Sequence, residues 1–293
     1  MNNRFQPFVL LLLLLAVCSL AAQERTVDPT FLHRFVPVLG EKTSDLSTAS
    51  CHYRPIFGDG DADAGILRGI ARYGEVKVDP GGATAQVSYA SEEQAYVILE
   101  GTGVLHYGEE RVPVKRQDFM YLPPSIRHGL SAAPDQSCRF IVMGFRIPAG
   151  ADLARPSKLL IANIDDVRQE VLTGHPPSTL YQLLMGDAQS KRDKLAAARV
   201  LTSLFIMEFA PGGTNFPHHH EREEEIYLVL SGHGEMVAGG GIEGIEGRHP
   251  AKAGDAYFFR LNCTVGFYAG NKPGEEKARI LAVRSLFPMK CGD

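Results

Sequence analysis

One short stretch of the chain concentrates side chains that can bind a metal ion. Residues 216–227, FPHHHEREEEIY, contain three histidines and four glutamates. In an extended strand, side chains two positions apart share a face, so His218 and His220 would point together while His219 points away. An acidic residue at the start of the next strand can face this pair. Two imidazoles and one carboxylate form a three-ligand set for a divalent transition metal.

The chain repeats itself, and the repeat indicates which elements hold this stretch. The segment IARYGEVKVDPGG at 70–82 is similar to TSLFIMEFAPGG at 202–213, because both read as an alternating strand that ends in Pro-Gly-Gly. The segments YVILEGTG and YLVLSGHG match at an offset of 131, and RQDFMYLPPS and AGDAYFFRLN match at 137. The additional residues fall in VAGGGIEGIEGRHP, a glycine-rich loop that can lengthen at little thermodynamic cost. We infer an internal duplication.

The pattern of each half predicts an all-β fold. Short alternating runs are separated by Gly, Pro and Asp turns, which is typical of an antiparallel sandwich or barrel. Between the halves, NIDDVRQEVLTG at 163–174 has an Asn cap, spaced apolar residues and a terminal Gly, so it predicts a short helix. STLYQLLMG at 178–186 is a candidate for a second helical turn.

The amino terminus has the layout of a secretory signal peptide. Arg4 precedes an apolar run of eleven residues, Phe8 to Cys18, and small residues follow, with cleavage expected near Ala21 or Ala22. This run is shorter than the ~20 residues that span a bilayer. We therefore expect a periplasmic or secreted protein. Val17, which precedes Cys18, is bulkier than the small residue usual before a lipidated cysteine.

Composition and cysteine count add further bounds. The net charge is −4 and no basic run of five residues occurs, so nothing indicates nucleic acid or an anionic membrane as a partner. Once the leader is removed, the remaining cysteines are Cys51, Cys138, Cys263 and Cys291. In an exported protein they could form disulfides with three alternative pairings, or they could be buried thiols.

The histidine stretch resembles the first motif of the cupin superfamily. It reads Gly212, five residues, His218, one residue, His220, four residues, Glu225, six residues, Gly232. Glu224 would fit the first gap, but only Glu225 leaves six residues before Gly232, so we expect Glu223 and Glu224 to face solvent. The resemblance covers residues 65–147 and 200–287. It implies a bicupin of two tandem jelly-roll barrels, each a double-stranded β-helix.

On this basis the chain divides into four parts. We expect a signal peptide at 1–22, an N-terminal cupin barrel at 23–150, a helical connector at 151–197 and a C-terminal cupin barrel at 198–293. The connector carries many leucines for a solvated linker, so it should pack against a barrel.

The second motif of the C-terminal half departs from the family. Arg260 and Asn262 replace the proline and glycine of the usual turn, and Val265 occupies the place of a third histidine. The resemblance therefore implies a metal held by two histidines and one glutamate, with positions open for water, substrate or dioxygen. Cys263, Asn262 and His233 are alternative candidates for a further ligand.

The N-terminal half departs in the opposite way. Val87, Tyr89 and Gln94 stand at the three ligand places of the first motif, while His128 holds the histidine place of the second. A single histidine does not hold a divalent metal. The resemblance therefore implies a metal-free barrel that serves packing, with His128 as a satisfied interior histidine.

These patterns lead to two hypotheses for function. A divalent Mn, Fe, Ni or Zn at His218, His220 and Glu225 would suit a dioxygenase, decarboxylase, isomerase or aminohydrolase acting on a small polar metabolite. The alternative is a non-catalytic exported cupin that binds a small molecule. Metal ligands inside a cavity favour the enzyme.

Two further residues are candidates for binding the substrate. Tyr227 shares the strand parity of Glu225 and should line the same cavity. Arg260, at the barrel mouth, could clamp an anionic group. The organisation also resembles that of the (S)-ureidoglycine aminohydrolase family, ammonia-releasing bicupins with a different metal-ligand pattern. Flat jelly-roll edges make a homodimer a candidate assembly.

Overall fold

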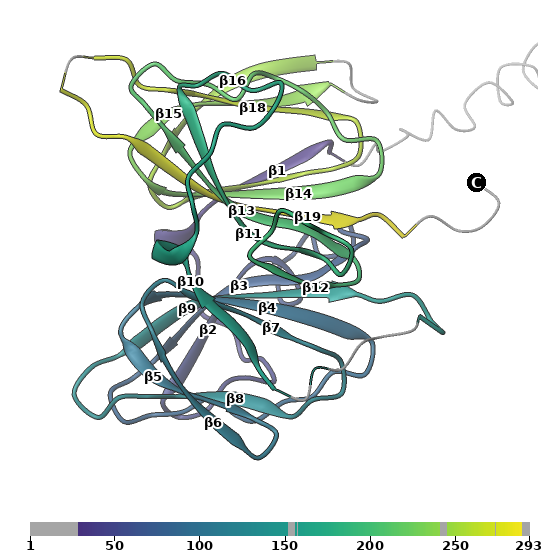
Figure 1. Cartoon of the computed structure of the whole chain (residues 1–293), viewed down its shortest axis with the longest axis vertical. Coiled ribbons are helices and arrows are strands. Elements are labelled where there is room, and N and C mark those ends of the chain that lie inside the picture. Colours follow the sequence, from purple (N-terminus) through teal and green to yellow (C-terminus); the bar gives the residue numbers. More distant parts are fainter. Residues whose placement is uncertain (1–28, 152–155, 157, 241–244, 273, 289–293) are drawn as a thin grey trace, which may run out of the picture.

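The structure, a computed structural model, describes residues 29–151, 156, 158–240, 245–272 and 274–288. The expected signal peptide with Cys18, and Cys291, lie outside the described residues. Figure 1 shows two β barrels stacked along the long axis, with the N-terminal half below and the C-terminal half above. The fold is all-β, and the two barrels are tandem jelly rolls, as the sequence predicted.

The N-terminal barrel consists of a six-stranded and a three-stranded sheet. The strand orders are β10-β7-β4-β9-β3-β2 and β6-β5-β8. Their bounds are β2 Cys51–Gly58, β3 Ile70–Val78, β4 Glu92–Glu100, β5 Thr102–Tyr107, β6 Glu110–Lys115, β7 Asp118–Leu122, β8 His128–Ala132, β9 Cys138–Arg146 and β10 Leu160–Asn163. All of the pairings between these strands are antiparallel.

The C-terminal barrel repeats this plan with a larger sheet. The strand orders are β1-β17-β14-β19-β13-β11-β12 and β16-β15-β18. Their bounds are β1 Phe31–Phe35, β11 Thr179–Asp187, β12 Leu195–Ala198, β13 Leu201–Phe209, β14 Glu223–Ser231, β15 His233–Gly240, β16 Ile245–Lys252, β17 Asp255–Phe259, β18 Cys263–Ala269 and β19 Ala278–Leu286. Strand β1 belongs to this sheet although its residues precede the first barrel, because it pairs with β17.

The large sheets of the two barrels pack against each other, so their strands are buried on both faces. On β14, Tyr227 and Val229 enter the core of their own barrel, while Ile226 and Leu228 enter a core shared by both barrels. Strand β4 alternates in the same way. This double burial explains why the centres of both strands read as continuous apolar runs.

The same alternation buries Glu224, which corrects the expectation that it faces solvent. Glu224 has the parity of Ile226, so it points at the other barrel and is fully buried. Its carboxylate accepts the backbone N–H groups of Arg68, Gly69 and Ile70 at 2.8, 2.7 and 3.2 Å. Glu223 is half-buried, not solvent-facing, because Arg284 donates to its carboxylate. An acid between the barrels is tolerated because its charge is fully hydrogen-bonded.

The duplication supplies a matching carboxylate from the first barrel. Glu93, 131 residues before Glu224, is also fully buried and accepts the N–H groups of three residues of the second barrel. These residues and their distances are Arg199 at 2.8 Å, Val200 at 2.7 Å and Leu201 at 2.8 Å. The two barrels are therefore joined by reciprocal carboxylates around a shared apolar core.

The connector differs from the expected helix. Between 163 and 174, one turn of 3-10 helix forms at Ile164–Asp166, and the Asn163 side chain caps it by accepting from the Asp165 N–H at 3.0 Å. The expected second helical turn is strand β11. Tyr181 and Leu183 face the core of the C-terminal barrel, and Leu184 and Met185 face the shared core. The leucines thus alternate between two cores, which requires a strand.

The described cysteines are buried thiols. Burial raises the pKa values of Cys51 and Cys138 to about 12. Cys263 is buried as well, and its thiol donates to the carbonyl of Thr264. Among the residues that the structure describes, no helix has the length and apolarity needed to cross a membrane.

Candidate metal centre

The three expected ligands meet inside the C-terminal barrel. His218 is held by a two-way backbone pairing with Val265 on β18, at 2.9 and 2.8 Å. The backbone carbonyl of His220 accepts the N–H of Asn262 at 2.9 Å. This bond holds the backbone at His220, two positions after His218. Glu225 lies on β14 and is 2 % exposed. One candidate ligand atom from each of His218, His220 and Glu225 lies within 4.8 Å of the other two.

Hydrogen bonding within the protein leaves one candidate ligand atom of each of the three residues available to a metal ion. His218 Nδ1 lies 2.8 Å from the carbonyl of Phe216, so Nδ1 carries the proton and Nε2 keeps its lone pair. His220 Nε2 lies 3.2 Å from Glu225 Oε2, but the two atoms lack hydrogen-bond geometry. Both atoms are buried and have no hydrogen-bond partner among the described residues. Buried polar atoms without partners are costly unless a further group joins them.

Electrostatics keep Glu225 ionised. Burial by itself would raise the pKa of this carboxyl, but contact with His220 and the positive charge of Arg284 lower it below its ordinary value. Arg284 Nε lies 3.9 Å from Glu225 Oε1. A carboxylate and two imidazole nitrogens at one point form a donor set that suits a divalent transition metal.

A cavity of about 100 Å³ adjoins these three side chains. Tyr227 lines it, as its parity predicted, and its hydroxyl accepts from Asn215 Nδ2 at 3.1 Å. Asn215 Oδ1 in turn accepts the N–H of Phe267 at 2.8 Å. Burial holds the pKa of Tyr227 well above its ordinary value, so this residue is a neutral, fixed wall of the cavity.

Several lining residues escaped the sequence reasoning. His175 comes from the connector, and its Nδ1 lies 3.0 Å from the Tyr181 hydroxyl and 3.2 Å from the carbonyl of Asn215. Ser203 is buried, and its hydroxyl has no hydrogen-bond partner among the described residues. Arg284 stands opposite Glu225 in the register of β14 and β19. Of these residues, only Arg284 has a signal in the sequence, because the alternation of β19 indicates which face it occupies. To identify Glu225 as its neighbour, the pairing of β14 with β19 must also be known.

Other expected residues do not line this cavity. Arg260 donates to the carbonyl of Pro29 at 3.4 Å and is absent from the cavity wall. Cys263 and Asn262 are absent from the wall as well. His233 is half-exposed and pairs with Glu275 at 3.1 Å. His219 is exposed, as the alternation predicted.

The corresponding place in the N-terminal barrel is filled by protein atoms. His128 is buried, with Nδ1 2.9 Å from the carbonyl of Ile126 and Nε2 3.2 Å from Gln94 Oε1. Burial lowers the pKa of His128, so the imidazole is neutral. Tyr89 accepts from Arg72 at 3.1 Å, and Val87 pairs with the backbone of His128. Side chains of the protein therefore contact one another at the place that the candidate metal ligands occupy in the other barrel.

Two tandem jelly rolls, one with a converged histidine pair and glutamate, define a bicupin. The chain belongs to the cupin family: the cupin domain matches residues 74–144 and 205–284, just over half of the chain. No curated protein matches it significantly in sequence.

Solved structures show the same fold over most of the chain. A putative glyoxylate-induced protein from Pseudomonas aeruginosa is 15% identical with a TM-score of 0.70, covering 92% of this chain and 93% of that one. Protein Ylba from E. coli is 14% identical with a TM-score of 0.65, covering 91% and 96%. The oxalate decarboxylase of Lactobacillus farciminis, a formate complex, is 14% identical with a TM-score of 0.64, covering 89% and 87%. At these identities the likeness concerns the fold.

Proposed function

We propose that this bicupin is a metal-dependent enzyme for a small polar metabolite, with one divalent transition metal held by His218, His220 and Glu225. The observation that carries the proposal is the pair of buried atoms, His220 Nε2 and Glu225 Oε2, that face each other without another partner. Burying them together is costly unless a cation joins them. Mn, Fe, Ni and Zn all accept mixed nitrogen and oxygen ligands.

The chain's own residues would prepare the site in three ways. The bond from His218 Nδ1 to the carbonyl of Phe216 fixes the tautomer that presents Nε2. The Glu225 carboxylate supplies the negative charge, and its burial keeps bulk water away. A metal bound there would polarise a substrate carbonyl or carboxylate, or lower the pKa of a bound water.

The cavity wall favours a small acid as substrate. About 100 Å³ is far below the ~300–1,000 Å³ of pockets that bind drug-sized ligands, so only a few non-hydrogen atoms fit. Arg284 places a positive charge at the wall, and the Ser203 hydroxyl faces this space without a partner among the described residues. A guanidinium and a hydroxyl are suited to a carboxylate. The reaction would be of dioxygenase, decarboxylase, isomerase or aminohydrolase type.

A binding protein without catalysis is the second candidate. Val265 stands where a third histidine would complete the ligand set, and its side chain is buried and cannot ligate. We propose export for either function, on the basis of the apolar leader. The mass of the mature protein purified from the periplasm or medium tests the export.

The deciding experiment is elemental analysis of the mature protein, purified without a histidine tag or chelator. We expect about one transition metal per chain, lost in His218→Ala and in Glu225→Ala. His128→Ala and His219→Ala are the matched controls and should keep the metal. Metal retained by the His218 variant would refute the ligand assignment.

Turnover separates the enzyme from the binding protein. Metal-loaded protein is screened for oxygen uptake, carbon dioxide release and ammonia release with small acids and ureides. Turnover that disappears in Glu225→Ala supports the enzyme. A loaded protein that binds small acids without converting any of them supports the second candidate.

A further inference from the structure

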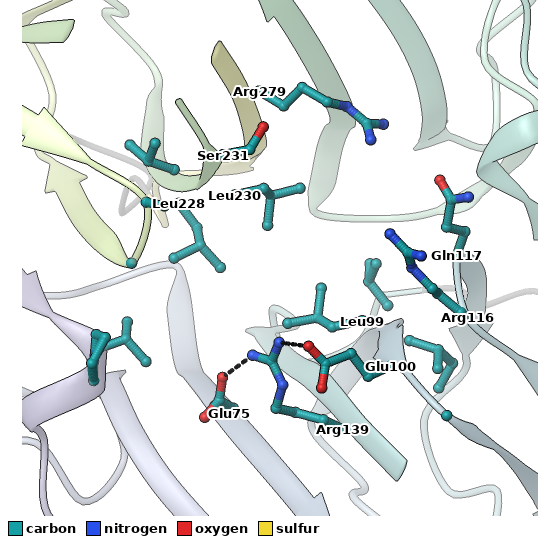
Figure 2. Close-up of a pocket in the computed structure, with 18 of the residues that line it drawn as sticks. Glu75, Leu99, Glu100, Arg116, Gln117, Arg139, Leu228, Leu230, Ser231 and Arg279 are labelled. Carbon is teal, nitrogen blue, oxygen red and sulfur yellow. Dashed lines mark hydrogen bonds and ion pairs between the residues drawn. The ribbon is translucent and has the colours of Figure 1, made fainter. Parts of the chain in front are cut away.

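A second and much larger cavity lies between the two barrels. It measures about 910 Å³, and none of its lining residues belongs to the metal cavity. Figure 2 shows Leu99 of β4 on one side and Leu228 and Leu230 of β14 on the other, with arginines around them. The cavity therefore combines apolar walls from both barrels with cationic groups.

The duplication places one arginine of each barrel at equivalent positions of this cavity. Arg139 on β9 stands opposite Glu100 on β4, and Arg279 on β19 stands opposite Ser231 on β14. A register irregularity precedes Glu100 and Ser231 alike, between Ile98 and Glu100 and between Val229 and Ser231. The two arginines are thus structural equivalents that differ in the residue facing them.

The first arginine is neutralised by carboxylates. Arg139 donates to Glu75 at 2.7 Å and to Glu100 at 2.5 Å, as the dashed lines of Figure 2 show. Arg54 donates to the other oxygen of Glu75 at 2.8 Å. These two arginines and two glutamates therefore form a chain without net charge.

The second arginine has no such partner. Its nearest carboxylate among the described residues is Glu208, 3.9 Å from Arg279 Nε, and Lys277 already binds Glu208 at 2.7 Å. Arg279 Nε is buried and makes no hydrogen bond among the described residues. Arg116, which is exposed, also lines the cavity. The lining itself contains four arginines and two glutamates, so cationic side chains outnumber carboxylates on the cavity wall.

We propose that the inter-barrel cavity binds an amphipathic carboxylate, with the carboxylate on Arg279 and the apolar part against Leu99, Leu228 and Leu230. A guanidinium with free N–H groups matches a carboxylate in shape and charge. The volume falls at the upper end of the ~300–1,000 Å³ typical of small-molecule pockets. It also exceeds that of the metal cavity, so this ligand is distinct from the proposed substrate.

Exchanging residues between the two equivalent positions tests the proposal. Octanoate serves as the probe and is titrated calorimetrically into the mature protein. Ser231→Glu supplies Arg279 with the carboxylate that Arg139 already has, so it should weaken octanoate binding at least tenfold. Glu100→Ser releases Arg139 from one carboxylate and should strengthen binding severalfold. Octanol, which has the same chain without the charge, should bind at least tenfold more weakly than octanoate.

Controls separate this outcome from loss of fold and from self-association. Thermal unfolding followed by circular dichroism, together with metal content, should be unchanged in both variants. Three results would overturn the proposal: no saturable binding of octanoate to the wild type, equal binding in Ser231→Glu, or equal binding of octanol. Analytical sedimentation could give a fourth result that overturns the proposal. If Ser231→Glu changes the mass of the sedimenting particle, the cavity is an interface between copies of the chain.

Discussion

Replacing Val265 by histidine should complete the metal site. The N-terminal barrel shows that the geometry allows it, because His128 stands at the place of Val265 and its Nε2 lies 3.2 Å from Oε1 of Gln94, the counterpart of Glu225. The backbone setting is the same in both halves, since Val87 bridges to His128 as His218 bridges to Val265. A histidine at 265 should therefore reach the carboxylate of Glu225.

The expected gain is a factor of about five to thirty in metal affinity. Four-ligand zinc sites bind with roughly 10–16 kcal/mol, or about 3 kcal/mol for each ligand. Burying the imidazole in place of Val265 costs about 1–2 kcal/mol. The remainder of about 1–2 kcal/mol corresponds to a factor of about five to thirty, because ~1.4 kcal/mol is a factor of ten.

The assay is competition for the metal against a chelator of known affinity, with Val265→Leu as a non-ligating control. Val265→His should bind more tightly than the wild type, and Val265→Leu should not. Turnover should fall in Val265→His, since the added imidazole occupies a position otherwise open to substrate. An unchanged affinity in a variant with the circular dichroism spectrum and melting temperature of the wild type would refute this reasoning.

Two predictions concern stability. Glu224→Ala should lower the free energy of unfolding by about 3–5 kcal/mol, because three buried N–H groups lose their acceptor. Urea unfolding measures this loss. It is carried out at pH 8 so that the wild-type carboxyl is ionised, since burial raises the pKa of Glu224. As a control, replacing the exposed Glu221 by alanine should change the free energy of unfolding by less than about 0.5 kcal/mol. A loss below about 1 kcal/mol for Glu224→Ala would contradict a stabilising role of the Glu224 carboxylate between the barrels. The lowered pKa of His128 means that its contribution to stability is complete above the unfolded-state pKa of about 6.5 and is lost as the pH falls toward the folded-state value. His128→Gln should therefore flatten the decline of melting temperature below pH 6.5, and parallel curves for wild type and variant would show the reasoning to be wrong.

The features that the sequence predicted are those with local signals. Strand alternation and the Pro-Gly-Gly turns are visible within a dozen residues, so the duplication and the all-β barrels could be predicted. The inward direction of Glu225 follows from its parity with Tyr227, and the spacing of His218 and His220 follows from the two-residue period of a strand. Apart from the duplication, which is found by comparing segments 131 residues apart, these arguments need only neighbouring residues.

The errors arise where a distant segment decides the environment. The parity that places Glu225 inside the barrel places Glu224 on the other face, and the sequence does not show that a second barrel covers this face. The pairing of β1 with β17 joins residues more than two hundred positions apart. His175 reaches the cavity from the connector, and the Asn163 cap starts a 3-10 turn as readily as a helix. None of these contacts leaves a periodic signal.

One exchange between neighbouring strands accounts for a filled site in one barrel and an open site in the other. In the N-terminal barrel, Arg72 on β3 stands opposite Gly144 on β9, whereas in the C-terminal barrel Ser203 on β13 stands opposite Arg284 on β19. The guanidinium of Arg72 lies 4.3 Å from the ring centre of Tyr89, the counterpart of His220. A Cβ at residue 144 would come within 2.7 Å of Arg72 Cγ, so glycine there makes room for the arginine.

In the C-terminal barrel the arginine approaches from the other strand. Arg284 donates to Glu223 at 3.4 Å, near the edge of the site, and the small Ser203 faces the cavity. Both barrels thus keep an arginine paired with a glutamate at the mouth, since Arg72 binds Glu92 as Arg284 binds Glu223. Only the arginine on β19 leaves space beside the candidate metal ligands. The arginine–glutamate pair is therefore common to both halves, and the strand that supplies the arginine determines which half keeps a cavity beside the candidate metal ligands.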